Sequence, residues 1–153
     1  MDNRFFLRLR QDQRWISDVT QTIIHVAVGV IIDDSGHVLL GRRLKGTHLA
    51  GYWEFPGGKV EPDETVLQAL DRELKEELDI RIVATSPLID VKHDYGDKQV
   101  WLDVHRVLEW RGTAKGVEGQ PLAWVGIDSL DEFEVPDANA PIMAEVRKLL
   151  TTV

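Results

Sequence analysis

The chain has 153 residues, 43% hydrophobic and 29% charged, which predicts one folded domain and argues against disorder. Because it contains no cysteine, disulfides, thiolate metal ligands and cysteine nucleophiles are excluded, and any metal must bind oxygen or imidazole ligands. The net charge of −8, from 26 acidic and 18 basic residues, argues against stable nucleic-acid binding, whereas a nucleotide needs only a few local cations and a bound metal ion.

Residues 1–20 differ from the rest of the chain because hydrophobic residues alternate with arginines there. We expect an N-terminal extension that packs on a main domain of residues 21–153; a partner-binding or dimerising segment is the alternative. The arginines interrupt any apolar core of a signal peptide, and there is no run of about 18 apolar residues. We therefore predict a cytoplasmic protein without a membrane partner, and we expect a monomer.

The first half of the main domain contains three predicted strands and a helix. Residues 22–32 form a β-branched run typical of a buried strand, and turn residues 33–36 separate it from a strand at 37–42. A short aromatic strand at 52–55 ends at Pro56-Gly57-Gly58. Thr65 and Gln68 then have the spacing of a capping box that begins a helix. Leucines at 67, 70, 74 and 78 give this helix one buried face, and we expect it to end near Asp79.

The second half is rich in predicted strands. They lie at residues 80–83, 88–93, 100–108 and 122–125, with a hairpin turn at 95–98. A final helix is predicted at 140–150, with Pro141 in its first turn. These elements predict an α+β fold in which a mixed β-sheet is sandwiched between α-helices.

Three glutamates on the first predicted helix conflict with the local rules of helix stability. Glu73, Glu76 and Glu77 share one sector, and each like-charge pair three or four residues apart costs an isolated helix about 0.2–0.5 kcal/mol. They also lie toward the C-terminal end, where the helix dipole disfavours anions. A hard divalent cation would reverse these penalties, so the cluster indicates a metal site. The alternative is a solvated acidic face paired with neighbouring lysine and arginine.

Residues 58–80 resemble the Nudix box, a motif with the pattern G-x5-E-x7-R-E-U-x-E-E-x-G-U, in which U is a bulky aliphatic residue. The matching positions are Gly58, Glu64, Arg72, Glu73, Leu74, Glu76, Glu77 and Ile80. The late glycine is replaced by Asp79. Since aspartate tolerates the left-handed backbone better than most residues, we expect slightly lower local stability and intact chemistry.

The resemblance implies the Nudix fold and hydrolysis of a nucleoside diphosphate linked to another group. It implies Mg²⁺, with Mn²⁺ as a substitute, bound by Glu73, Glu76, Glu77 and Glu118 and by the backbone carbonyl of Gly57 or Gly58. Glu64 and Arg72 would pair and orient Glu73; a plain salt bridge is the alternative. We favour Glu73 as the general base, with Glu118 as the second candidate.

The resemblance extends over roughly residues 23–150 to the MutT branch of the family, which removes oxidised guanine nucleotides. It implies that substrate is bound by Arg43, His48, Glu54, Phe55, Pro56, Gly57, Lys59 and Asn139. Alternative interpretations remain for His48 and Arg43 as surface residues and for Asn139 as a helix cap. Lys98 stands where arginine is expected, so a base contact from that loop is in doubt.

Asn139 offers a chemical basis for selecting the oxidised base. Oxidation at C8 turns the N7 acceptor of guanine into a donor, and an asparagine amide could accept from N7–H while donating to O6. The leading hypothesis is therefore a nucleotide-pool enzyme that hydrolyses 8-oxo-dGTP to 8-oxo-dGMP and pyrophosphate. A Nudix hydrolase for CTP, a modified dCTP or several nucleoside triphosphates is the alternative. A non-catalytic base-recognition module is the third hypothesis, disfavoured by the complete set of glutamates.

Overall fold

The central strand of the protein is β1 (Thr22–Ile31), seen in a computed structural model that describes residues 22–151. It pairs in parallel with β6 (Lys98–Arg111) and antiparallel with the short β4 (Gly57–Lys59). Strand β5 (Arg81–Asp94) adds antiparallel to β6, which gives the order β4-β1-β6-β5. A second, antiparallel sheet has the order β3-β2-β7, from β3 (Trp53–Glu54), β2 (Val38–Arg42) and β7 (Leu122–Val125). The predicted mixed sheet is confirmed.

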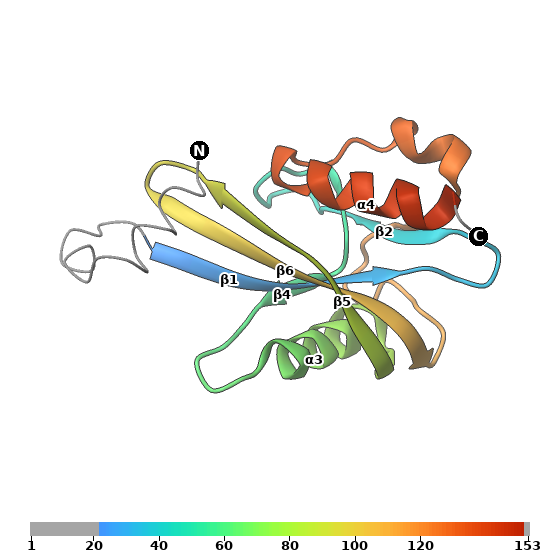
Figure 1. The fold of residues 1–153 in the computed structure, drawn as a ribbon, viewed down its shortest axis with the longest axis horizontal. Helices are drawn as coiled ribbons and strands as arrows, with labels where there is room; N and C mark the ends of the chain where they lie inside the picture. Colours follow the sequence, from blue (N-terminus) through green and yellow to red (C-terminus); the bar gives the residue numbers. More distant parts are fainter. Residues whose placement is uncertain (1–21, 152–153) are drawn as a thin grey trace.

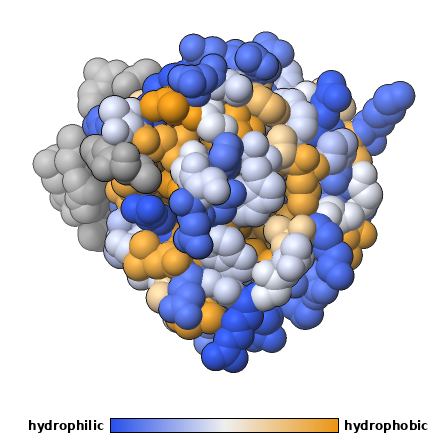
Figure 2. Space-filling view, turned by 90° about the vertical axis from the view of Figure 1, so that its right-hand side faces the viewer, coloured by the Kyte–Doolittle hydropathy of each residue, from blue (hydrophilic) through white to orange (hydrophobic). Residues whose placement is uncertain are grey.

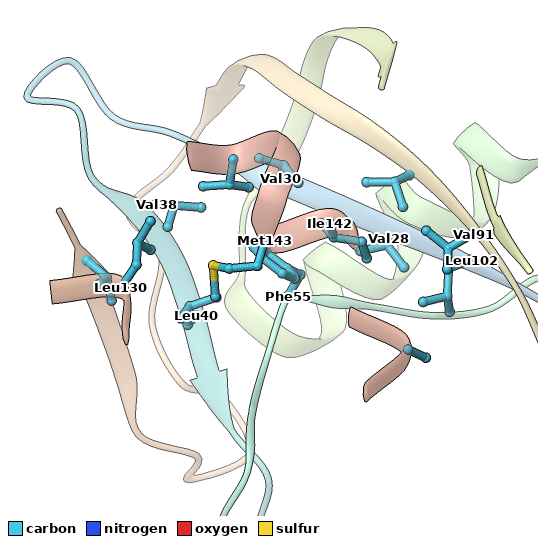
Figure 3. Packing of buried hydrophobic residues seen from close by; sticks show 14 of the residues in the cluster. Val28, Val30, Val38, Leu40, Phe55, Val91, Leu102, Leu130, Ile142 and Met143 are labelled. Carbon is cyan, nitrogen blue, oxygen red and sulfur yellow. The ribbon is translucent and has the colours of Figure 1, made fainter. Parts of the chain in front are cut away.

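Strand β1 is buried on both faces because its alternate side chains enter two hydrophobic clusters. Ala27 and Ile31 pack in a cluster with the buried leucines of α3 (Val66–Leu78), while Val28 and Val30 pack in the other with α4 (Ala140–Thr151). Figure 3 shows the second cluster, in which Val28 lies beside Ile142 of α4. The two helices accordingly lie on opposite sides of the sheet (Figure 1), as the sequence predicts.

Both ends of α3 follow the local chemistry of its sequence. The Thr65 hydroxyl accepts from the backbone of Gln68 at 3.1 Å, and the Gln68 side chain accepts from the backbone of Thr65 at 2.9 Å. At the other end Asp79 is left-handed, with φ 58° and ψ 41°, and its carboxylate pairs with Lys75 at 2.5 Å and Lys115 at 3.4 Å. Lys75, and then Lys115, lower the pKa of Asp79. The predicted capping box and the left-handed conformation of Asp79 are both confirmed.

Several elements differ from their predicted bounds. Residues 81–94 form one strand where two were predicted, because Pro87 and three register shifts interrupt the regular ladder without ending the strand. Proline is tolerated there since β5 lies at the edge of its sheet. Residues 57–59 form β4 although the two glycines suggested the end of a strand, and the short 3₁₀ helices η1 (Ile127–Glu132) and η2 (Asp137–Asn139) were not predicted.

The surface carries no broad hydrophobic face on the side seen in Figure 2, where hydrophobic areas are broken up by hydrophilic residues. None of the helices in residues 22–151 has the length and apolar character that crossing a bilayer requires. The N-terminal extension predicted for residues 1–20 lies outside the described residues.

Candidate metal and nucleotide site

Arg72 joins the loop before α3 to the glutamates on the helix. Its guanidinium donates to both carboxylate oxygens of Glu64, at 2.7 and 2.8 Å, to Glu73 at 2.9 Å and to the backbone carbonyl of Lys59 at 3.1 Å. Arg72, together with the backbone N–H of Glu61, lowers the pKa of Glu64 to about 2. This geometry holds the Glu73 carboxylate in one orientation, as the predicted Glu64–Arg72–Glu73 arrangement requires.

The Glu73 carboxylate lies directly against the backbone of Gly58. A Cβ atom at Gly58 would lie 2.3 Å from Cδ of Glu73 and 2.5 Å from both of its carboxylate oxygens. The neighbouring Gly57 is equally constrained, since a Cβ there would lie 2.0 Å from the carbonyl oxygen of Ala27 on β1. Both glycines therefore serve close approach: Gly57 to the adjacent strand and Gly58 to the carboxylate.

Glu77 lies one turn after Glu73 on α3, so the two carboxyl groups form a pair on the same side of the helix. Glu77 lies close to Glu73 and to the backbone N–H of Gly57, and both groups influence its pKa. Burial raises the pKa of Glu77 to about 9, and the neighbouring Glu73 and the charge of Glu54 act in the same direction. Without a cation, the folded protein therefore disfavours full ionisation of this group.

A cleft of about 190 Å³ opens beside Glu77. Its lining includes four further residues of the predicted site, namely Arg43, Glu54, Pro56 and Glu118. Arg43 is held by an ion pair with Glu54 at 2.8 Å and by donating from Nε to the backbone carbonyl of His48 at 2.5 Å. The cleft thus combines a positioned guanidinium with several carboxylates.

Glu118 reaches this cleft because its loop is fastened to the end of α3. The backbone N–H of Val117 and the side-chain amide of Gln120 both donate to the carbonyl of Glu77, each at 3.0 Å. No local sequence pattern indicates this role of Gln120, because the contact joins residues 43 positions apart.

Other predicted residues are not brought into the cleft. The Glu76 side chain is 57% exposed and faces Arg72 at 3.5 Å, and the side chains of His48 and Lys59 lie at the surface. Phe55 is buried in the cluster on the α4 side, which also contains Ala138, the neighbour of Asn139 (Figure 3 shows Phe55 near Met143). Asn139 itself ends η2, directly before α4.

The donor set fits a hard divalent cation. Glu73 and Glu77 present oxygen donors next to each other, and Glu54 and Glu118 line the same cleft as Glu77. Burial, and then the charge of Glu73, raise the pKa of Glu77, and a bound cation would offset both effects. In residues 22–151, however, no three histidine, aspartate or glutamate side chains converge on one position as they stand. Glu76 and Glu118 would have to turn toward the Glu73–Glu77 pair to complete a coordination sphere.

Comparison with known proteins places this geometry in a family. The family model described as NUDIX domain matches residues 27–145. The chain belongs to the Nudix family. Its fold is the Nudix fold, and the resemblance of the glutamate motif is confirmed. Nudix hydrolases generally need a divalent metal, so the chain is a metal-dependent hydrolase.

Two relatives and one solved structure show which members of the Nudix family this chain resembles. The chain is 35% identical to the 8-oxo-dGTP diphosphatase of Escherichia coli over 82% of its length and 98% of that protein. It is 34% identical to the CTP pyrophosphohydrolase of the same organism, over 76% of this chain and 86% of that protein. A structure described as MutT from Aliivibrio salmonicida and Vibrio cholerae matches with a TM-score of 0.75 and 32% identity, covering 84% of this chain and 99% of that one.

Proposed function

We propose that this Nudix hydrolase converts 8-oxo-dGTP to 8-oxo-dGMP and pyrophosphate and depends on Mg²⁺, with Mn²⁺ as a substitute. The observation that carries the proposal is the similarity to the E. coli 8-oxo-dGTP diphosphatase over 98% of that protein. The Glu73–Glu77 pair beside a cleft that also holds Arg43 supports it.

The cation would be held by the carboxylates of Glu73, Glu76, Glu77 and Glu118 and by the backbone carbonyl of Gly57 or Gly58. Bound Mg²⁺ supplies charge neutralisation for the phosphate oxygens and a lowered pKa for attacking water. Arg72 keeps Glu73 fixed through the bidentate contact with Glu64. Arg43, which directly follows β2 and lines the same cleft, offers positive charge to the triphosphate.

The reaction is a hydrolysis without a covalent enzyme intermediate. A water molecule forms a bond to one of the two phosphorus atoms joined by the α–β bridging oxygen, while the bond between that phosphorus and the bridging oxygen breaks, which yields 8-oxo-dGMP and pyrophosphate. Glu73 accepts the proton of the attacking water, and Glu118 is the second candidate for this role. The ion pair with Arg72 at 2.9 Å keeps the Glu73 carboxylate oriented for that transfer.

Glu77→Gln tests the metal assignment. Glutamine has the same size, so the variant is expected to fold while Mg²⁺ binding and turnover are nearly abolished. Isothermal titration with Mg²⁺ and a steady-state assay of kcat/KM measure both effects. Substantial residual activity in a variant with unchanged thermal unfolding would contradict the assignment.

Asn139 is proposed to select the oxidised base, with its amide oxygen accepting from N7–H and its NH₂ group donating to O6. Because a buried mismatch of this kind costs about 1–3 kcal/mol, the preference for 8-oxo-dGTP over dGTP is expected to depend on this side chain. Asn139→Ala is expected to erase the preference in kcat/KM. Unchanged selectivity would show that Asn139 only serves the start of α4.

CTP hydrolysis is the second candidate function, favoured by the relative named for that reaction. The motif on α3 acts on the phosphates and does not distinguish the bases. A panel of 8-oxo-dGTP, dGTP, CTP and ADP-ribose, compared by kcat/KM with Mg²⁺, separates the candidates. The highest value for CTP would replace the proposed substrate, and the highest value for ADP-ribose would overturn both candidates while leaving the family assignment intact.

The enzyme is further proposed to act as a monomer without stable nucleic-acid binding. The net charge of −8 and the broken-up hydrophobic surface in Figure 2 support this. Light scattering of the full chain tests the first point, and a DNA-binding titration at physiological salt tests the second.

A further inference from the structure

The last turn of α3 ends against a loop that supplies its missing hydrogen-bond donors. The final carbonyl groups of a helix have no partner within the helix. Here the backbone N–H of Lys115 donates to the carbonyl of Leu78, and that of Val117 donates to the carbonyl of Glu77, both at 3.0 Å. The loop that carries Glu118 is thus docked on the helical turn that carries Glu77.

The side chain of Gln120 connects the two glutamates more directly. Its Nε2 donates to the backbone carbonyl of Glu77 at 3.0 Å, while its Oε1 accepts from the backbone N–H of Glu118 at 3.0 Å. Only a side chain that carries both a donor and an acceptor can make these two bonds together. The tight turn that allows them needs Gly116, since a Cβ there would lie 2.1 Å from the carbonyl oxygen of Gln120.

Glu118 needs such support because its side chain is exposed, whereas Glu77 is held within the carboxylate pair. An exposed loop carboxylate must be ordered before it can share a ligand with a helix residue, and ordering it costs conformational entropy. Gln120, Glu77 and Glu118 all line the same cleft. A fixed backbone at Glu118 removes part of that cost before any ligand arrives.

We infer that Gln120 is a positioning residue, which sets Glu118 relative to Glu77 so that both carboxylates can reach one divalent cation. This inference rests on the proposed function, because it requires Glu118 to be a cation ligand. Loss of a residue that orients a metal ligand typically weakens metal affinity about 10–100-fold. We expect an effect of that size, without loss of the fold.

The first test compares Mg²⁺ affinity by isothermal titration, without nucleotide, in the wild type and in Gln120→Met. Methionine preserves length and packing but lacks both hydrogen bonds. Lys115→Ala is the matched control. Lys115 lies in the same loop as Gln120, and its loss breaks the ion pair with Asp79 but leaves both hydrogen bonds of Gln120 in place. We expect affinity to fall 10–100-fold in Gln120→Met only. A Gln120→Met protein that binds Mg²⁺ like the wild type would overturn the inference.

A double-mutant cycle shows whether Gln120 acts through Glu118. If it does, Gln120→Met weakens Mg²⁺ binding in the wild type but adds little once Glu118→Gln is present. Additive losses would overturn the inference. If Gln120→Met lowers the melting temperature strongly, the titrations of all variants are run at a temperature at which circular dichroism shows each of them to be folded.

A titration of Glu77→Gln separates this inference from the proposed function. Unchanged Mg²⁺ binding in Glu77→Gln would refute the metal site itself. Lost binding in Glu77→Gln with unchanged binding in Gln120→Met would refute only the positioning role. A further readout is activity against Mg²⁺ concentration, because excess Mg²⁺ is expected to restore kcat in Gln120→Met, whereas a merely structural defect would not respond to Mg²⁺.

Discussion

Replacing Gly58 with alanine is expected to damage catalysis far more than folding. The new Cβ would lie 2.3 Å from Cδ of Glu73, which is the flexible end of a side chain and can move away. Displacement breaks the contact between Glu73 and Arg72, a partly exposed ion pair worth about 0.2–1 kcal/mol. The melting temperature is therefore expected to fall by no more than about 2–4 °C.

The catalytic loss follows from the role proposed for Glu73. A positioned general base contributes about 10²–10⁴-fold, so kcat/KM of Gly58→Ala is expected to fall within that range. The assay is pyrophosphate release from 8-oxo-dGTP with saturating Mg²⁺, run beside a thermal melt of the same sample.

Two other glycines serve as controls. Gly36→Ala has nothing within 4 Å of its Cβ but a φ of 79°, so it is expected to cost about 1 kcal/mol of stability and no activity. Gly57→Ala would press against the Ala27 carbonyl at 2.0 Å, where backbone must move, and is expected to lower both stability and activity. A Gly58→Ala enzyme with kcat/KM within a few-fold of wild type would refute the reasoning about Glu73.

Three further changes probe the helix and its ends. Arg72 lowers the folded-state pKa of Glu64 to about 2, so the ionised carboxylate stabilises the fold above its unfolded pKa, and this stabilisation is lost as the pH falls toward 2. The free energy of unfolding in urea, measured between pH 5 and 2, is therefore expected to depend less on pH in Glu64→Gln than in the wild type. Equal pH dependence in the two proteins would contradict this. Thr65→Ala removes the capping box and is expected to cost about 1 kcal/mol in the same assay at pH 7, with an unchanged midpoint as the contrary result. Asp79→Gly relieves left-handed strain but loses the ion pair with Lys75, so the two effects are expected to offset each other and leave the urea midpoint nearly unchanged, and a clear loss would show that the lysine contacts dominate.

Local chemistry explains which parts of the fold and site could be predicted from the sequence. The capping box at Thr65 and the left-handed turn at Asp79 involve residues only a few positions apart, so the sequence contains all the information needed. The orienting contact from Arg72 to Glu64 spans eight positions and was predicted through the family motif.

Features that depend on distant partners could not be predicted in this way. Strand β4 exists because β1 pairs with it, although two of its three residues are glycines. The amide of Gln120 has a role only because the fold brings residue 120 beside residue 77. The cleft likewise needs Arg43, which directly follows β2, and Glu54 of β3 to lie near the end of α3.

The irregularity of β5 also bears on whether two molecules of the protein can pair through the edges of their sheets. An edge strand of 14 residues would offer a long row of free backbone groups to any passing strand. Pro87 has no backbone N–H, and the three register shifts, all between Ile82 and Ile89, interrupt the regular ladder in that part of the strand. At the opposite edge, β4 has only three residues. Within residues 22–151, the two edges of the main sheet therefore consist of one irregular strand and one very short strand, both features that disfavour the addition of a strand from a second molecule.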